Sequence, residues 1–245
     1  MIRSHNHEGV LEICLDRPDK RNALSHAMYD RLGELIEQAG ADGACAAVIL
    51  HGAGGMFTAG ADIQDFQTRR GHEDSPAVRF LRKLARTDVP VIAAVEGFAI
   101  GIGATLLQHV DFVYATPQTR FRMPFVALGL CPEAGSSLLL ERLVGARRAR
   151  EWLLQCKPFD GQEAHEAGFV TALAEPGQVL ATARATAADL AQLPRASLRA
   201  GKALLRRSHE AELMGALDAE VRAFADLLNT EDTQRIFKAF LEKTR

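Results

Sequence analysis

Two short turns of small residues and one carboxylate could carry chemistry in this sequence. Residues 57–63 (FTAGADI) follow the apolar run 46–50, and residues 96–103 (EGFAIGIG) follow the apolar run 91–95. Each turn is expected to lead from a buried strand into a helix start, where free backbone N–H groups collect. Two such groups aimed at one point would stabilise a developing oxyanion.

The carboxylate is Glu133, within residues 129–135 (GLCPEAG). A carboxylate near an oxyanion site could act as a general base. The alternative is structural, because proline at the first position of a helix and a negative charge near its positive end are both common. The residues alone leave both interpretations of Pro132 and Glu133 open.

Composition places the chain among ordinary globular proteins. It has 245 residues, of which 47% are hydrophobic and 24% charged, and its formal net charge is -2. This length suffices for one large α/β domain, or for one domain with a helical extension. The small net charge gives no reason to expect nucleic acid or an anionic membrane as a partner.

The cysteines and histidines of the sequence give no indication of disulfides, a thiol nucleophile or a metal site. The four cysteines lie far apart without a C-x-x-C pair, which fits a reducing compartment. Cys131 lies beside Glu133, but no histidine partner is evident from spacing, so we disfavour a thiol nucleophile. No histidine pair has metal-binding spacing, and we expect His5 and His7 in a frayed N-terminus, so no metal site is predicted.

Targeting signals are not evident in the sequence. The N-terminus lacks a secretion pattern, and no apolar run reaches the roughly 18 residues of a membrane span. The final residues do not form a peroxisomal signal. We therefore expect a cytoplasmic protein with no membrane partner.

Hydrophobic patterning predicts alternating strands and helices, a rhythm typical of parallel pairing. From about residue 137 the pattern is almost wholly helical, and residues 160–163 resemble a capping box. Apolar stripes beyond residue 195 indicate core or subunit packing. Strands are expected at 9–15, 46–50, 91–95 and 110–115, and helices at 25–39, 76–87, 103–109, 195–207, 210–228 and 231–243.

These segments resemble the crotonase superfamily, also called the enoyl-CoA hydratase/isomerase family. The resemblance covers most of the chain: residues 16–24 resemble its first coenzyme A loop, 57–63 its adenine and first oxyanion-hole segment, and 95–111 its second. It implies an α/β fold, a crotonase-like spiral of repeated ββα units followed by a helical trimerisation region. The resemblance divides the chain into a spiral core with the thioester site, residues 1–194, and a C-terminal oligomerisation region, residues 195–245.

The resemblance also implies roles for individual residues. The oxyanion-hole donors would be the backbone N–H groups of Ala61 and Ile102. The partner would be an acyl-CoA substrate, whose coenzyme A enters with the substrate, so no separate cofactor is expected. A homotrimer or a dimer of trimers is expected. Residues expected to bind coenzyme A or the acyl group are Arg21, Ala23, Ala59, Gly60, Asp62, Ile63 and Phe125.

Hydratases of this family resemble one another in carrying two glutamates, whose positions match Thr105 and Phe125 here. Neither residue can transfer the required proton. Glu133 instead matches the single catalytic glutamate of isomerases that convert 3-enoyl-CoA to 2-enoyl-CoA. We therefore favour an isomerase with Glu133 as base and acid. We expect a further group of residues either to form a wall for the acyl chain or to belong to the core: Phe121, Met123, Phe125 and Leu130.

Two other functions remain open. The first is an enoyl-CoA hydratase or a related lyase that uses Glu133 with an ordered water. The second is an acyl-CoA-binding protein without turnover. The paired turns and the surviving carboxylate disfavour the second.

Overall fold

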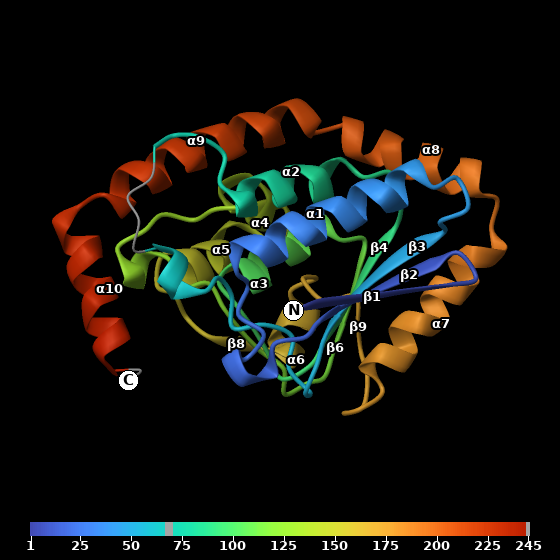
Figure 1. Cartoon of the computed structure of the whole chain (residues 1–245), viewed down its shortest axis with the longest axis horizontal. Coiled ribbons are helices and arrows are strands. Elements are labelled where there is room, and N and C mark those ends of the chain that lie inside the picture. The colour runs from blue at the N-terminus through green and yellow to red at the C-terminus, as the bar shows by residue number, and fades with distance from the viewer. Residues whose placement is uncertain (67–70, 244–245) are drawn as a thin grey trace.

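Two β-sheets organise the chain, and from residue 91 onward the chain passes back and forth between them (Figure 1). The computed structural model describes residues 1–66 and 71–243. The larger sheet has the order β1-β2-β3-β4-β6-β9 and the smaller β5-β7-β8. Their strands are β1 (Ile2–His7), β2 (Val10–Leu15), β3 (Ala47–Gly52), β4 (Val91–Val95), β5 (Phe98–Ile100), β6 (Phe112–Ala115), β7 (Arg120–Arg122), β8 (Phe159–Asp160) and β9 (Ala172–Leu173). The alternation of β4, β5, β6 and β7 between sheets is the α/β crotonase fold expected from the sequence.

Strand alternation gives each face of the larger sheet its own helices. Ala47 and Ile49 of β3 pack with the small residues of α7 (Val179–Gln192). Val48 and Leu50 point to the other face and join the main core with residues of α1 (His26–Ala41). Parallel strands covered on both faces are continuously apolar, which is why runs 46–50 and 91–95 were recognisable.

The first strand corrects one expectation. His5 and His7 lie in β1, which pairs antiparallel with β2 in the register His5 to Glu12 and His7 to Val10. Five of the six residues of β1 are exposed, so the apolar alternation that marks a strand is missing. An edge strand with polar residues on both faces resembles a loop in sequence.

The smaller sheet was also missed, because its strands have only three or two residues. Its hydrophobic side faces an aromatic cluster in which Trp152 and Phe159 stack at a centroid distance of 3.5 Å. Phe121 stacks on Phe159 at 5.3 Å, and Phe169 meets their rings edge-on. The offset contact of Phe121 and the edge-on contacts of Phe169 stabilise a core beyond the area they bury.

The helices lie close to their predicted ranges. Asp160 caps its helix as the capping-box pattern predicted, accepting from the Glu163 N–H at 2.9 Å. Within residues 1–66 and 71–243, each helix is too short or too polar to cross a bilayer. The remaining α-helices are α2 (Pro76–Arg86), α3 (Ile102–Thr105), α4 (Ser136–Val144), α5 (Ala146–Leu153), α6 (Gly161–Glu166), α8 (Arg195–Arg207), α9 (Glu210–Leu228) and α10 (Glu231–Lys243). Short 3-10 helices cover Pro18–Lys20, Ile63–Phe66, Leu106–His109 and Val126–Leu128.

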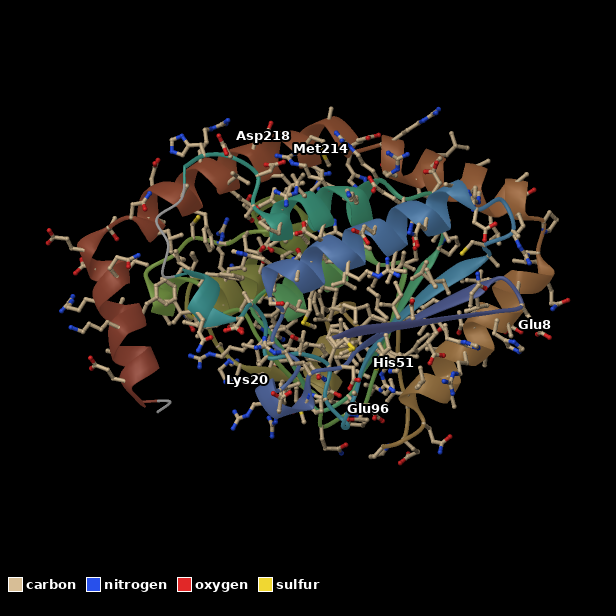
Figure 2. The ribbon with its side chains drawn as sticks, viewed as in Figure 1. Glu8, Lys20, His51, Glu96, Met214 and Asp218 are labelled. Carbon is tan, nitrogen blue, oxygen red and sulfur yellow. The ribbon has the colours of Figure 1, made fainter. Side chains whose placement is uncertain are left out.

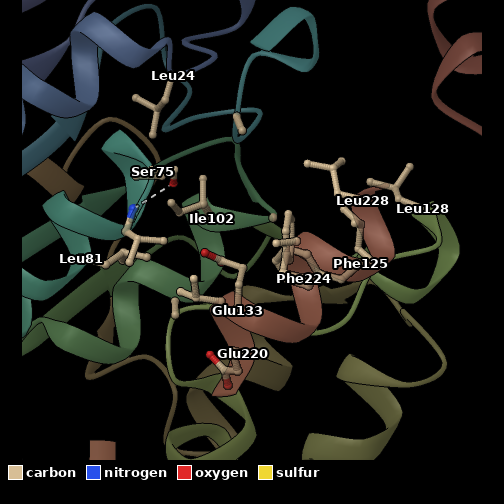
Figure 3. Close-up of a pocket in the computed structure, with 18 of the residues that line it drawn as sticks. Leu24, Ser75, Leu81, Ile102, Phe125, Leu128, Glu133, Glu220, Phe224 and Leu228 are labelled. Atoms are coloured by element: carbon tan, nitrogen blue, oxygen red, sulfur yellow. Dashed lines mark hydrogen bonds between the residues drawn. The ribbon is translucent and has the colours of Figure 1, made fainter. Parts of the chain in front are cut away.

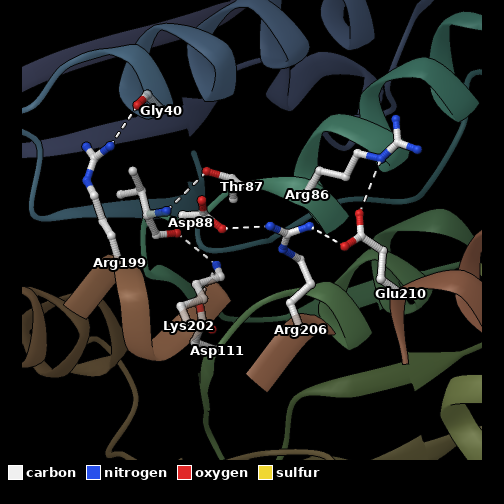
Figure 4. Close-up of polar contacts among 10 residues, drawn as sticks. Gly40, Arg86, Thr87, Asp88, Asp111, Arg199, Lys202, Arg206 and Glu210 are labelled. Atoms are coloured by element: carbon white, nitrogen blue, oxygen red, sulfur yellow. Dashed lines mark hydrogen bonds and ion pairs between the residues drawn. The ribbon is translucent and has the colours of Figure 1, made fainter. Parts of the chain in front are cut away.

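Helix α8 is attached by cations rather than by apolar burial, since none of its residues is fully buried (Figure 4). Lys202 donates to Asp111 at 2.7 Å and to the Val89 carbonyl at 2.8 Å. Arg206 pairs with Asp88 at 2.9 Å, and Arg199 donates to backbone carbonyls around the end of α1. These contacts place the start of α9, which then crosses above α2 in Figure 1.

Phe159→Ala is expected to lower the free energy of unfolding by about 3–5 kcal/mol, since Phe159 is 2% exposed and its removal leaves a cavity between three aromatic rings. Urea unfolding followed by circular dichroism measures this. The conservative variant Phe159→Leu fills most of the space and should lose less. Equal losses in the two variants would show that the loss of the ring contacts, and not the cavity volume, sets the cost at this position.

Candidate active site

The first small-residue turn is anchored by Thr58. Its hydroxyl donates to the Asn22 carbonyl at 2.7 Å and accepts from the Gly60 N–H at 3.0 Å. Gly60 has φ of 93°, and a Cβ there would lie 2.5 Å from the Ile100 carbonyl oxygen, so only glycine permits this close approach. The turn therefore packs directly against the second turn and presents the Ala61 amide beside it.

The second turn is joined to the first by backbone pairing. Thr58 N donates to the Phe98 carbonyl and Ile100 N donates to the Thr58 carbonyl, both at 3.1 Å. Gly101, with φ of 57°, is the N-cap of α3, which begins at Ile102. In the part of the chain that the structure describes, neither the Ala61 N–H nor the Ile102 N–H donates to a protein acceptor, and both residues line one cavity. These amides are free to bind an oxygen atom of a ligand.

Glu133 lies in the loop before α4 and faces the same cavity. Its Oε1 accepts a hydrogen bond from the Thr105 hydroxyl. Burial is the main cause that raises the pKa of Glu133, from its usual 4.5 to about 8, while the Thr105 hydroxyl opposes this rise. A carboxyl with a pKa near neutral pH is suited to accept and return a proton.

The structural alternative for Glu133 does not hold. Helix α4 begins at Ser136 with Gly135 as its N-cap, so Glu133 precedes the helix instead of occupying its first turn. Ala134 has φ of 61°, a conformation unusual for a residue other than glycine, and it turns the chain between Glu133 and the helix. The local backbone aims Glu133 into the cavity.

Thr105 has a role that sequence comparison alone did not reveal. Its position was noted only because it lacks the glutamate of hydratases, yet its hydroxyl contacts Glu133. Gln108 extends the network, donating to the Thr105 carbonyl at 3.1 Å and to the Ser136 hydroxyl at 2.7 Å. The Ser136 hydroxyl donates to the Glu133 carbonyl at 2.6 Å. The backbone and the side chain of Glu133 are thus both held by α3 and its neighbours.

A second carboxylate, Glu220 of α9, also lines the cavity and was not predicted. It is 7% exposed and accepts from Gly135 N at 2.6 Å, Ser137 N at 2.8 Å and Ser137 Oγ at 2.5 Å. Burial is the main cause that raises the pKa of Glu220, and the donors from Ser137 and Gly135 oppose it. An acidic residue in an amphipathic helix normally faces solvent, so nothing in the sequence marked this one.

The cavity has a volume of about 500 Å³ and a largely apolar wall. Figure 3 shows Glu133 with Ile102 on one side and Phe224 and Phe125 on the other. Of the predicted acyl wall, Phe125 and Leu130 line the cavity, whereas Phe121 and Met123 are fully buried core residues. The C-terminal helices α9 and α10 supply further apolar lining, which the sequence did not assign to the site: Leu217, Val221, Phe224, Leu228 and Phe237.

The predicted coenzyme A residues divide into two groups. Ala59 and Ile63 line the cavity, whereas Arg21, Ala23, Gly60 and Asp62 are not part of its lining. Asp62 forms an ion pair with Arg17 at 2.7 Å, and the same arginine donates to the Ala23 carbonyl at 3.2 Å. Arg21 is exposed at the end of the 3-10 helix Pro18–Lys20.

Cys131 is a poor nucleophile in this setting. Burial, with a smaller contribution from the charge of Glu220, raises the pKa of its thiol to about 11. Nucleophilic attack requires the thiolate, which is scarce at neutral pH for such a group. Over residues 1–66 and 71–243, no three His, Cys, Asp or Glu side chains converge in a way that could hold a metal ion.

Comparison with known proteins assigns the family. A profile described as enoyl-CoA hydratase/isomerase matches residues 5–245. The chain belongs to the enoyl-CoA hydratase/isomerase family. It is 32% identical to the 2,3-dehydroadipyl-CoA hydratase of Escherichia coli (strain K12), over 96% of this chain and 92% of that protein. It is 34% identical to the 1,2-epoxyphenylacetyl-CoA isomerase of the same organism, over 89% and 87%.

Similarity to solved structures agrees with this family. The structure of Pseudomonas aeruginosa OdaA matches with a TM-score of 0.95 and 39% identity, covering 98% of each chain. Hydratase names are frequent among the relatives, and an isomerase is present as well. The protein is an acyl-CoA-processing enzyme of the enoyl-CoA hydratase/isomerase family, and the finer assignment depends on its own site residues.

Ile102→Pro is expected to reduce turnover by about 100–1,000-fold, the usual scale for removing one oxyanion-hole donor. Proline is tolerated at the first position of a helix, where the lost N–H has no partner within the helix, so the fold should survive. The control Ile102→Val keeps the amide. Steady-state kinetics with circular dichroism tests this, and a folded, fully active proline variant would refute the placement of the oxyanion hole.

The pH dependence of kcat/KM should report Glu133. As a base Glu133 must be ionised, so the rate is expected to rise as pH passes about 8. This rise is the limb of the pH profile that reports Glu133. Thr105→Val removes a hydrogen bond that favours the ionised form, so it should raise the pKa of Glu133 and move the limb to higher pH. A profile that is flat from about pH 6 to 9, or a limb unmoved in Thr105→Val, would contradict the assignment.

Proposed function

We propose that this enzyme shifts the double bond of a 3-enoyl-CoA to give a 2-enoyl-CoA. The observation that carries the proposal is one carboxyl with a pKa of about 8, Glu133, in the cavity that the free Ala61 and Ile102 amides line. Moving a double bond by one position requires a single base that can return its proton. Neither of the hydratase positions, Thr105 and Phe125, carries an acid.

The reaction balances with the residues of this site. Ionised Glu133 removes a proton from C2, which both the thioester carbonyl and the C3–C4 double bond make acidic. The electron pair moves into a dienolate whose charge lies largely on the thioester oxygen, and the Ala61 and Ile102 amides stabilise that oxygen. Protonated Glu133 then returns the proton at C4, and the double bond is left between C2 and C3. The reaction itself transfers no electrons to another molecule and needs no redox cofactor.

Hydration is the second candidate, because hydratase names are frequent among the relatives and the cavity contains another carboxylate, Glu220. Hydration needs one group to activate water and a second to deliver a proton. Both oxygens of Glu220 already accept hydrogen bonds, from Gly135 on one side and Ser137 on the other. This occupation disfavours Glu220 as the second acid or base, and we place hydration below isomerisation.

The substrate we propose carries an apolar acyl group on coenzyme A. The cavity wall formed by Phe125, Leu128 and Phe224 offers contact area for hydrocarbon and excludes water from the dienolate. Binding of the nucleotide by Arg21, Ala23, Ala59, Gly60, Asp62 and Ile63 is part of this proposal. A raised-pKa carboxyl beside two unpaired amides would serve no purpose in a protein that only binds acyl-CoA.

A trimer or dimer of trimers in the cytoplasm remains a prediction. The stripe of α9 that suggested subunit packing, including Leu213 and Leu217, packs on its own chain. Leu204 and Leu205 of α8 are 66% and 76% exposed. The division into a core, 1–194, and an oligomerisation region, 195–245, likewise stays a prediction, and the second region supplies part of the cavity.

Glu133→Gln is expected to lower isomerisation of 3-hexenoyl-CoA by about 100-fold or more, because it keeps the shape of the side chain and removes the proton acceptor. Binding of an acyl-CoA product analogue, measured by calorimetry, should survive since the amides are unchanged. The wild type should hydrate crotonyl-CoA poorly. Efficient hydration by the wild type would overturn the isomerase proposal in favour of the second candidate.

A further inference from the structure

Glu220 is unusual among the charged residues of this chain. It is 7% exposed, whereas Glu212, Asp218 and Asp226 of the same helix are exposed. It lies on α9, 85 residues from Gly135 along the chain, yet its carboxylate meets the loop that carries Glu133. Figure 3 shows the two carboxyl groups one above the other, on separate ribbons.

The contacts of Glu220 are those of an ionised carboxylate. All three of its partners are donors: the Gly135 N–H, the Ser137 N–H and the Ser137 hydroxyl. The two backbone N–H groups can only donate and fall on different oxygens of Glu220, so the ionised form accepts from all three partners at once. Hydrogen bonds to a charged acceptor are among the stronger ones in proteins, so α9 holds this loop firmly.

The loop needs such a hold. Ala134 and Gly135 both have positive φ, at 61° and 72°, which an L-alanine adopts only at a free-energy cost. This pair of left-handed residues separates Glu133 from α4. Without an acceptor for the Gly135 and Ser137 amides, the loop could relax and carry Glu133 away from Ile102.

We propose that Glu220 is a positioning residue for Glu133: from α9, it fixes the loop 133–137 so that Glu133 faces the oxyanion amides. A negative charge held there has a second effect, because it raises the pKa of Glu133. The proposal rests on the proposed role of Glu133 as the base. It assigns a function to α9 that goes beyond lining the cavity.

The pKa of Glu133 depends on the groups that surround it. Its burial and the charge of Glu220 raise its pKa, and Thr105 lowers it. His109, whose Nε2 lies 2.7 Å from the Ala134 carbonyl, has a pKa lowered by burial to about 4 and is neutral near pH 7. Cys131 is a neutral thiol there. The other titratable groups that line the cavity are His26 and Tyr29 of α1, Glu73 before α2, and Arg122 of β7.

The first test is Glu220→Gln, which keeps the length of the side chain but sets an amide N–H₂ against backbone donors and removes the charge. We expect kcat for 3-hexenoyl-CoA to fall by about 10–100-fold while KM stays within about twofold, since small misplacement of a catalytic group lowers turnover. The limb of the pH profile should also move to lower pH, because a neighbouring negative charge is lost. A merely structural role would leave this limb in place.

If Glu220→Gln does not fold, Ser137→Ala still tests the proposal. It removes only the hydroxyl donor to Glu220 and should lower kcat, and an unchanged kcat in this variant would overturn the proposal. Where Glu220→Gln folds, the loss caused by Ser137→Ala should vanish in the Glu220→Gln background if the contact is the cause. The control Asp218→Asn, labelled in Figure 2, removes a half-exposed carboxylate of the same helix that pairs with Arg82 of α2 at 2.6 Å, and it should leave kcat and the pH profile unchanged.

A direct measurement separates this proposal from the proposed reaction. The pKa of Glu133 can be followed by carbon NMR of the labelled side-chain carboxyl, assigned with Glu133→Gln, with no substrate present. A lower pKa in Glu220→Gln than in the wild type and Asp218→Asn supports the proposal whatever reaction the enzyme catalyses. An unchanged pKa together with an unchanged kcat in Glu220→Gln would overturn it. Failure of the wild type to isomerise would overturn only the proposed reaction.

Discussion

The short parallel pairing between Thr58 and the strand around Ala99 is the constraint on which the site depends. Two hydrogen bonds of 3.1 Å lock the two glycine turns together, and the Gly60 backbone approaches Ile100 too closely for any side chain. The positions of the two free amides are therefore fixed by backbone geometry. Such preorganised donors need no rearrangement when charge develops on a bound oxygen.

Burial of Glu133, the base that we propose, makes its ionised form unfavourable for the stability of the fold. The pKa of Glu133 rises on folding from 4.5 to about 8, so between these values the folded protein holds a proton that the unfolded chain has released. Stability then falls as pH rises across this interval, because the native state binds more protons than the unfolded state. The ionised form of Glu133, which the proposed reaction requires, is thus the form that the fold tolerates least.

The two glycine turns could be found from the sequence because a glycine turn after an apolar strand is a local pattern, and the family resemblance then suggested Glu133 as the base. Three features lay outside the reach of the sequence. β1 has polar residues on both faces, so no alternation marks it. Thr105 was visible only as a missing acid, although its hydroxyl meets Glu133. Glu220 joins the site through a contact between residues 85 apart, which no periodicity encodes.

The order of these elements along the chain has a consequence for biosynthesis. A ribosome releases the turn of Ala61 first, then that of Ile102, then Glu133, and only afterwards α9 with Glu220 and Phe224. Until α9 docks, the cavity lacks one apolar wall and the loop of Glu133 lacks its acceptor. A nascent chain can therefore form the two glycine turns before it can hold Glu133 against them, and the complete candidate site exists only after α9 has been synthesised and has docked.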